Sequence, residues 1–120
     1  MANETDLIQK FIDSSHAVIY IKDEQGRFIM VNRYAAGLVN LSPEDFVGKT
    51  DHDFFSKEDS DMFRANDLKV TEAGTPMSFK GKHTTEGGER TIIDHKFPVS
   101  LEGHPNSVGG IAIDITDLEE

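Results

Sequence analysis

The sequence predicts an α+β fold, in which an antiparallel sheet carries its helices on one face. Strand patterns fall into two groups, a pair near the start and a trio near the end, and a block of helices separates the groups. Within each group no helix intervenes, and strands joined without a helical crossover pair antiparallel. Each strand also offers only one clearly apolar face, which is typical of a sheet covered by helices on one side.

The last strand, expected within residues 107–117, is the element around which the others are organised. Its apolar side chains alternate with smaller or polar ones, and this period of two indicates a strand with one buried face. They are Ile111, Ile113 and Ile115. A strand with so few charges is expected in mid-sheet, because exposed edge strands are normally protected by charges or proline. Gly109 and Gly110 at its start allow close backbone approach but weaken the strand.

Spacing and turn residues define the first half of the chain. Residues 5–15 predict an amphipathic helix, because four apolar side chains recur three and four positions apart. They are Leu7, Ile8, Phe11 and Ile12. Residues 17–22 and 27–31 are predicted as the two strands of a hairpin, joined by a turn at residues 23–26. Asn32 is expected to cap a short helix that runs to about Val39.

Two helix starts carry capping signals. Ser42, followed by Pro43 and an acidic residue, predicts a short helical turn. Ser56, also followed by acidic residues, opens the longest helix, which Gly74 is expected to end. One side of this helix carries Phe63, Asn66, Val70 and Ala73.

The last three strands alternate apolar and polar side chains. Residues 77–84 and 90–99 flank a hairpin turn at residues 86–89, and residues 100–106 are expected to form a loop. On the strand predicted at residues 90–99, apolar side chains alternate with polar residues and a proline. The apolar residues are Ile93, Phe97 and Val99, and the residues between them are Asp94, Lys96 and Pro98. If the apolar set faces the helices, His95 also lies inward, as a polar group in an apolar pocket.

Composition and charge limit the function classes. The chain has 120 residues, a formal net charge of -10 and no cysteine. A negative charge disfavours nucleic acid and anionic membranes as partners. The lack of cysteine excludes disulfides, thiolate metal sites and a cysteine nucleophile. No apolar run is long enough to cross a bilayer, and the polar, acidic start lacks the features of a signal peptide. The expected location is therefore cytoplasmic.

The order of elements and several short stretches resemble the PAS family of sensory domains. The matching stretches are residues 21–27 leading to 31–32, residues 47–55, residues 96–99 and residues 110–116. No one stretch is specific, and the resemblance rests on their order and spacing between residues 5 and 117. It implies a PAS-like five-stranded antiparallel sheet of strand order 2-1-5-4-3. It also implies that helices packed on one face can enclose a small-molecule cavity.

The resemblance also implies a domain organisation. Residues 1–16 would form an N-terminal amphipathic helix, residues 17–117 the PAS domain, and residues 118–120 the start of an exit helix or linker to an output domain. In relatives of this family, the strand-to-helix exit couples the sheet to a kinase, cyclase or similar output domain. The exit residues expected here are Asp114 and Thr116, whose side chains would also suit a helix cap.

A non-catalytic sensory module that binds a small cytosolic ligand is the first functional hypothesis. The expected pocket combines apolar side chains with a few polar groups that orient the ligand. Its predicted lining residues are Phe28, Met30, Phe63, Asn66, Val70, His95 and Phe97. Each of them also fits an ordinary core or hydrogen-bonded position, because aromatic and methionine side chains at strand or helix spacing usually belong to the core.

Haem, a cysteinyl flavin and a metal are not expected as cofactors, which leaves an unknown small organic ligand or none. Flavin photosensors of the resembled family form an adduct with cysteine, and haem-binding members usually carry the iron-binding histidine on the long helix; this chain has neither. The carboxylates and imidazole of residues 51–53 could ligate a metal. Capping by an aspartate and a structural role for His52 explain them more simply. His83 and His95 make a weak metal pair.

Two other hypotheses stay open. A ligand-free dimerisation and relay module would fill its core with side chains and form a homodimer through the N-terminal helix. A small enzyme would use His52 or His95 with nearby acids as an acid–base pair. No nucleophile triad, phosphate loop or metal-ligand spacing supports the enzyme. The domain itself is therefore expected not to be an enzyme, while its parent protein would be a kinase or cyclase, for example a histidine kinase of a two-component system.

Overall fold

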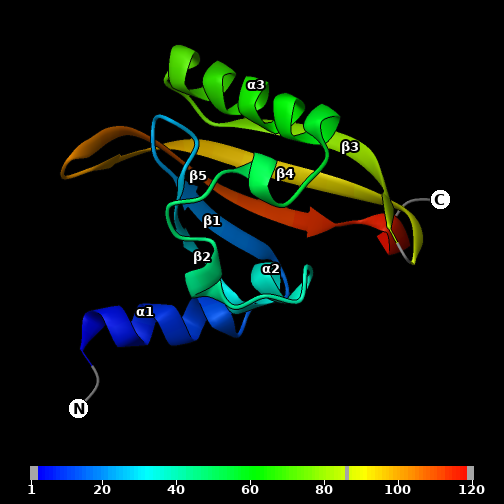
Figure 1. The fold of residues 1–120 in the computed structure, drawn as a ribbon, viewed down its shortest axis with the longest axis horizontal. Coiled ribbons are helices and arrows are strands. Elements are labelled where there is room, and N and C mark those ends of the chain that lie inside the picture. Colours follow the sequence, from blue (N-terminus) through cyan, green and yellow to red (C-terminus); the bar gives the residue numbers. More distant parts are fainter. Residues whose placement is uncertain (1–2, 86, 119–120) are drawn as a thin grey trace.

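The computed structural model describes residues 3–85 and 87–118. In this part of the chain, three α-helices, five strands and three short 3-10 turns follow the predicted order (Figure 1). The elements are α1 (Glu4–Asp13), β1 (Val18–Lys22), β2 (Phe28–Val31), α2 (Arg33–Gly37), η1 (Pro43–Asp45), η2 (Asp51–Asp53), α3 (Lys57–Ala73), β3 (Met77–Thr85), β4 (Gly88–Leu101), β5 (His104–Asp114) and η3 (Thr116–Leu118).

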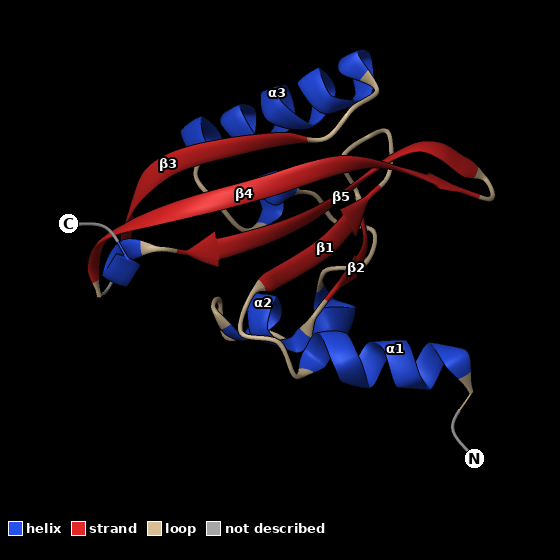
Figure 2. Cartoon of the chain, turned by 180° about the vertical axis from the view of Figure 1, so that it is seen from behind, coloured by secondary structure: helices blue, strands red, loops and turns tan. Residues whose placement is uncertain are grey.

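The five strands form one antiparallel sheet in the order β2-β1-β5-β4-β3. β5 lies in the middle, between β1 and β4, which confirms the position predicted from its apolar pattern. The helices α2 and α3 lie over one face of the sheet (Figure 1). The view from behind shows the strands β1, β4 and β5 facing the viewer, and no helix covers this face of the three strands (Figure 2). The α+β fold class is thereby confirmed.

The helix boundaries follow the capping signals. α3 begins after Ser56, whose Oγ accepts a hydrogen bond from the backbone N–H of Asp59 at 3.1 Å. It ends at Gly74, which adopts the left-handed conformation with φ 68°. Ser42 opens η1, and its backbone N–H donates to the carboxylate of Asp45 at 2.9 Å. These local bonds satisfy the backbone groups that a helix end leaves without partners.

The prediction of a loop over residues 100–106 is wrong. β5 begins at His104, so the connection from β4 is a tight turn in which Gly103 has φ 81°. The expectation rested on Gly103 and Pro105, and proline cannot donate to a strand ladder. Proline is tolerated here because β5 pairs with β1 only from Val108 onward, so the first residues of β5 have a single neighbouring strand.

The side chains of β4 face the reverse of the expected directions. Lys96 pairs with Gly110 on β5, which pairs with Tyr20 on β1, and residues paired across strands share a face. Lys96 is 1% exposed and Tyr20 is 5% exposed, so this row lies under the helices. His95 and Phe97 belong to the rows on the opposite face. The apolar alternation predicted the wrong face because ion pairs, rather than apolar contacts, bury the inner row of this strand.

Gly109 and Gly110 make room for rings from the neighbouring strands. A Cβ atom at Gly110 would lie 2.1 Å from the ring of Tyr20, and one at Gly109 would lie 2.7 Å from the ring of Phe97. The two glycines point to opposite faces, since side-chain directions alternate along a strand. The central strand therefore accepts one aromatic side chain across each of its faces.

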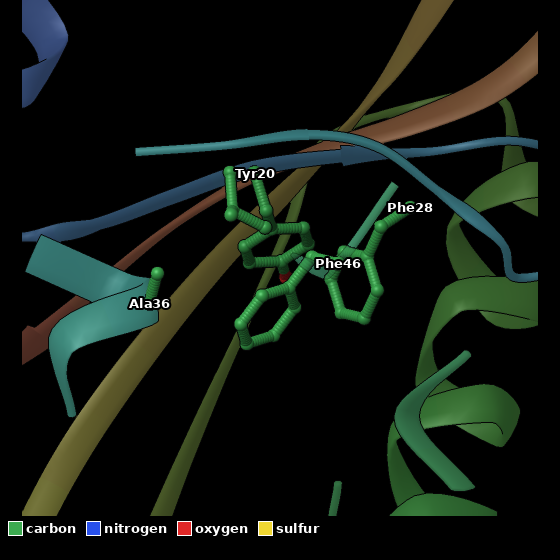
Figure 3. Packing of buried hydrophobic residues seen from close by; sticks show 5 residues of the cluster. Tyr20, Phe28, Ala36 and Phe46 are labelled. Carbon is green, nitrogen blue, oxygen red and sulfur yellow. The ribbon is translucent and has the colours of Figure 1, made fainter. Parts of the chain in front are cut away.

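The apolar core is small and aromatic. Its main cluster of buried residues consists of Tyr20, Phe28, Val31, Ala36 and Phe46. The rings of Phe28 and Phe46 meet edge-on with 5.2 Å between centroids, and Tyr20 meets Phe28 in the same way at 6.4 Å (Figure 3). Edge-to-face pairs of this kind add stability beyond the area that they bury. This cluster joins β1 and β2 to α2 and to the segment after η1.

The N-terminal helix α1 is present as predicted, but it buries little of its apolar stripe. Ile12 is 8% exposed, whereas Leu7, Ile8 and Phe11 are 65%, 59% and 77% exposed. The stripe therefore has no partner surface among the described residues of a single chain. Each helix in the described ranges is too short or too polar to cross a bilayer.

Candidate functional site

Two lysines are buried between α3 and the sheet, and carboxylates surround both. Lys22 Nζ lies 2.6 Å from Asp51 Oδ2 and 3.0 Å from Asp67 Oδ2. Lys96 Nζ lies 2.7 Å from Asp67 Oδ1 and 3.3 Å from Asp94 Oδ2. The side chains of Lys22, Lys96 and Asp67 are 4%, 1% and 3% exposed. We call these five residues and Tyr20 the buried charge network.

Four separate elements bring the network together. Lys22 ends β1 and pairs with Val108, while Lys96 lies on β4 and pairs with Gly110, so the two lysines flank the central strand β5. Asp67 projects from α3 and bonds both ammonium groups. Its two carboxylate oxygens therefore bridge β1 and β4 across β5. Among the described residues, this aspartate supplies the ion pairs between α3 and the sheet.

Tyr20 extends the network across β5 at the level of Gly110. Its hydroxyl accepts a hydrogen bond from Lys96 Nζ at 2.8 Å and donates to Asp94 Oδ1 at 2.9 Å. The ring also faces both ammonium groups, with Lys22 Nζ 5.0 Å and Lys96 Nζ 5.1 Å from its centroid. Contacts of this kind stabilise a desolvated cation through the ring quadrupole. The absence of a side chain at Gly110 is what lets the phenol reach β4.

Burial and charge set the protonation of the network. Burial, followed by the charge of Asp94, raises the pKa of Tyr20 well above its ordinary value, so the phenol stays protonated and can donate. Burial opposes the charge on Lys22, but Asp67 and Asp51 outweigh it and hold the pKa of this lysine above its ordinary value. Burial also raises the pKa of Asp51, although Lys22 opposes that shift.

The polar atoms of the network have hydrogen-bond partners, but burying its charges costs free energy. Within the described part of the chain, buried side-chain nitrogen and oxygen atoms all have hydrogen-bond partners. Taking each ion out of water still costs several kcal/mol, and buried ion pairs often contribute no net stability relative to well-packed apolar residues. Titratable groups held in such surroundings cluster at functional sites. The network is therefore the strongest functional candidate in this fold.

The predicted ligand residues divide between the two faces of the sheet. Phe28 and Val70 are fully buried on the helix side, and Phe63 lies there too, with its ring centroid 6.0 Å from Lys22 Nζ. Asn66, the next predicted residue on α3, is half-buried.

Three predicted ligand residues lie on the face of the sheet opposite α3. Met30 and Phe97 fall in one cross-strand row through Gly109. His95 is exposed, and its Nδ1 lies 2.8 Å from Ser78 Oγ. An inward position for His95 and Phe97 is wrong, because the row that includes Lys96 occupies the inner face of β4. Met30, on β2, lines a hollow beside α1 instead.

The histidine and acid cluster of residues 51–53 does not converge on one point. Asp53 closes the turn as expected of a cap, by accepting from the backbone N–H of Thr50 at 2.9 Å. Asp51 instead belongs to the buried network, and His52 Nε2 lies 2.8 Å from Asp61 on α3. Capping by one of the two aspartates therefore holds through Asp53. A backbone partner was expected for His52 and is wrong, because its ring contacts the side chain of Asp61.

Another group, in the described residues, has metal-ligand chemistry. Asp23, Glu24 and His104 each place a ligand atom within 4.8 Å of the others. These atoms already have partners: His104 Nδ1 lies 2.7 Å from Glu24 Oε1, and Asp23 Oδ1 accepts from the backbone N–H of Gln25 and Arg27 at 2.9 Å each. These bonds give the group a structural role, which is to attach the β1–β2 turn to the start of β5.

Two hollows open near the site. A small one of about 120 Å³ reaches Asp51 from outside, and its wall includes Ser60 and Arg64 of α3. The larger one, of about 520 Å³, lies between α1, β2 and η1, and none of its lining residues comes from α3. The first adjoins the buried charge network, and the second does not.

The end of β5 is tied to the start of β4. Asp114 Oδ2 accepts from Arg90 Nε at 2.8 Å, and Asp114 Oδ1 accepts from the hydroxyl and the backbone N–H of Thr116 at 2.6 Å and 2.9 Å. The Thr116 hydroxyl in turn accepts from the backbone N–H of Thr91 at 2.8 Å. The guanidinium of Arg90, followed by the Thr116 groups, holds the pKa of Asp114 far below its ordinary value.

Sequence reasoning missed Tyr20, Lys22, Asp67 and Lys96 as site residues. One signal was available for Asp67: together with Ser60, Phe63 and Val70 it forms a stripe at spacings of three and four, and three of the four are fully buried. The lysines gave no such signal, because an isolated lysine in a strand is normally solvent-exposed.

Comparison with known sequences decides the family. The sequence profile of the PAS fold family matches residues 12–120. The chain is a member of the PAS fold family. The five-stranded sheet and its strand order agree with this assignment.

A curated relative supports the same family, and solved structures share the fold. The chain is 31% identical over 110 residues to the methanogenesis regulatory histidine kinase FilI of Methanothrix harundinacea, covering 91% of this chain and 12% of that protein. VqmA of Vibrio cholerae, in a complex with ligand and DNA, superposes with a TM-score of 0.80 at 23% identity, over 97% of this chain and 53% of VqmA. A PAS domain from Colwellia psychrerythraea gives 0.70 at 20% identity, over 96% and 99% of the two chains.

Proposed function

We propose that this PAS domain is a non-catalytic sensory module that binds a small cytosolic ligand between α3 and the sheet. The buried charge network is the observation that supports this proposal. Lys22, Asp67, Tyr20 and Lys96 place polar groups of both signs inside the fold, where a few such groups can orient a ligand. Of the residues predicted from the sequence, Phe28, Phe63, Asn66 and Val70 fit the walls of this site.

The ligand state would reach an output domain through the end of β5. Lys96 and Arg90 lie on the same strand, β4, and Arg90 holds Asp114 while Thr91 holds Thr116. A change at the network that shifts β4 against β5 would therefore strain these exit bonds. Differential binding to two states of such a joint is what lets a ligand bias an output. The kinase FilI, of which this chain covers 12%, illustrates the class of protein expected to carry the domain.

The test is native mass spectrometry of the purified chain, followed by a thermal-shift screen of small metabolites. A co-purifying compound, or a compound that raises the melting temperature, is expected. Lys96→Met should abolish the response, and Ser78→Ala, on the uncovered face of the neighbouring strand, should not. A chain that carries no compound and responds to none would count against the proposal.

A ligand-free dimerisation and relay module is the second candidate. Two observations favour it: the network is already fully bonded by side chains, and the apolar stripe of α1 is exposed. In this case the helix would pair with a second copy, and the core would hold no ligand.

The proposal includes no nucleic-acid partner for this domain. Its net charge of -10 opposes contact with a phosphate backbone. The VqmA complex contains DNA, but this chain corresponds to only 53% of that protein. The isolated domain is therefore expected to leave the fluorescence anisotropy of labelled duplex DNA unchanged at low salt.

A further inference from the structure

The carboxylate of Asp67 occupies a position that is built for an anion. Its Oδ1 lies 2.7 Å from Lys96 Nζ and its Oδ2 lies 3.0 Å from Lys22 Nζ, so each oxygen binds a different ammonium group. The two lysines come from different strands and converge above the central strand β5. Charge-assisted bonds of this type are among the strongest polar contacts in proteins.

The helix that supplies this carboxylate buries little apolar surface. Of the residues of α3, only Ser60, Asp67 and Val70 are fully buried, and two of these are polar. Met62 and Leu68 on the same helix are 42% and 46% exposed. An element with little buried apolar area can open at small cost. Asp61 also contacts His52, and Arg64 donates to the backbone of Glu24, but neither partner lies on a strand. The Asp67 bridge is therefore the attachment of α3 to the sheet that a ligand could replace.

The two bonds that Asp67 makes decide which ligand could replace it. If Asp67 left without a substitute, Lys22 would keep Asp51 and Lys96 would keep Asp94 and Tyr20, but each buried ammonium group would lose one charge-assisted bond. A ligand without an anionic group would not restore those two bonds at full strength. A ligand that carries a carboxylate would keep both the charge and the two-oxygen geometry unchanged.

We infer that the ligand of the proposed sensory site is a small carboxylic acid, whose carboxylate takes the place of Asp67 between Lys22 and Lys96 and releases α3. This inference rests on the proposed function. Lys96 keeps its bonds to Tyr20 and Asp94 when Asp67 leaves. The sheet side of the site therefore stays assembled while the helix moves.

The first test removes the internal carboxylate. Asp67→Ala leaves both lysines and creates a space of carboxylate size, so sodium acetate or propionate should stabilise this variant. A rise in melting temperature of about 3–8 °C is expected at ten times the dissociation constant. Sodium chloride at the same ionic strength should give no such rise, and Asp67→Ala with Lys96→Met should not respond. An equal effect of chloride, or a response of the double variant, would overturn the inference.

Asp67→Asn keeps the side-chain shape and serves if the alanine variant does not fold. Because the competing charge is gone, this variant should bind acetate at least ten-fold more tightly than the parent chain, measured from the amide shifts of Val108 and Gly110 during titration. Equal affinities of the two chains would overturn the inference.

The identity of a co-purifying compound separates the two proposals. A compound with a carboxyl group supports both of them. A compound without an acidic group overturns this inference and leaves the sensory function standing. A chain that carries no compound and responds to no metabolite removes the sensory function, and with it the ligand class inferred here.

Discussion

At the scale of single residues, Lys96 and His95 show how adjacent residues of one strand can place a buried charge on one face and an exposed side chain on the other. They are neighbours on β4, yet Lys96 is 1% exposed and bonds three groups, whereas His95 is exposed and contacts Ser78. Polar residues on the inner face are normally excluded unless partners surround them. The partners of Lys96 come from β1, α3 and β4 itself, so its burial is a property of the assembled fold.

Lys96→Met should destabilise the domain by about 3–5 kcal/mol, because it removes one buried cation from contact with Asp67, Asp94 and Tyr20. His95→Ala, one position away, should change stability by less than about 1 kcal/mol, since its side chain is exposed. Urea unfolding monitored by circular dichroism measures both. Similar losses for the two variants would contradict the assignment of faces on β4.

At the scale of elements, β5 depends on two glycines that face opposite sides. Gly110 lies under Tyr20, whose ring is buried and held by Asp94 and Lys96, so it cannot move aside. Gly109 lies under Phe97, on the uncovered face, where the side chain can shift. The same substitution should therefore have unequal effects at adjacent positions.

Gly110→Ala should cost about 1–3 kcal/mol or more through overpacking, and Gly109→Ala clearly less. When Tyr20 is first replaced by alanine, the cost of Gly110→Ala should fall by at least half, because the clashing ring is gone. Thermal unfolding of the parent chain and these four variants, the double variant included, tests this. A cost that is unchanged in the Tyr20→Ala background would show that strand propensity, rather than the ring, is responsible.

The junction of β4 and β5 predicts a pH dependence. The folded-state pKa of Asp114 lies below its ordinary value of about 3.9, so its contribution to stability is present above that pH. The contribution is lost as pH falls below about 4, toward the folded-state pKa.

Asp114→Asn should therefore be less stable than the parent chain at pH 7, and the difference should shrink steadily below about pH 4. Urea unfolding at a series of pH values measures the difference. Glu102→Gln, at the exposed turn between the same strands, is the control for removing one carboxylate. A difference that stays constant down to pH 2 would contradict the role of the Arg90 and Thr116 contacts.

At the scale of the whole molecule, the exposed stripe of α1 needs an explanation that a single chain does not provide. Three large apolar side chains on one helix face are mostly in contact with solvent: Leu7, Ile8 and Phe11. Contiguous exposed apolar surface of this kind marks interaction sites more often than chance. A homodimer through α1 is the proposal that accounts for it.

Phe11→Glu should shift the chain to monomer in sedimentation velocity without lowering its melting temperature, because the side chain is 77% exposed. Thr5→Glu adds the same charge at another exposed position of the helix, and it should leave association unchanged. A parent chain that is monomeric at high concentration would exclude the dimer.

The sequence predicted the order of the elements, the mid-sheet position of β5 and the helix caps at Ser56 and Gly74. These features depend on local signals: side-chain period, capping chemistry and the charge of a strand. At Asp114 and Thr116 the sequence predicted a helix cap, whereas the structure shows the two side chains bonded to each other and to β4. Family membership also followed from the sequence, because the order and spacing of short stretches carry it.

Only the tertiary structure decided the inner face of β4 and the composition of the candidate site. Lys22, Asp51, Asp67 and Lys96 come from four elements, and the ion pairs among these four join residues 29 or 45 positions apart. Burial of each charge is favourable only when the others are already in place, so no local pattern could reveal it. Hydrophobic alternation alone placed Phe97 inward, and the assembled ion pairs placed Lys96 there instead.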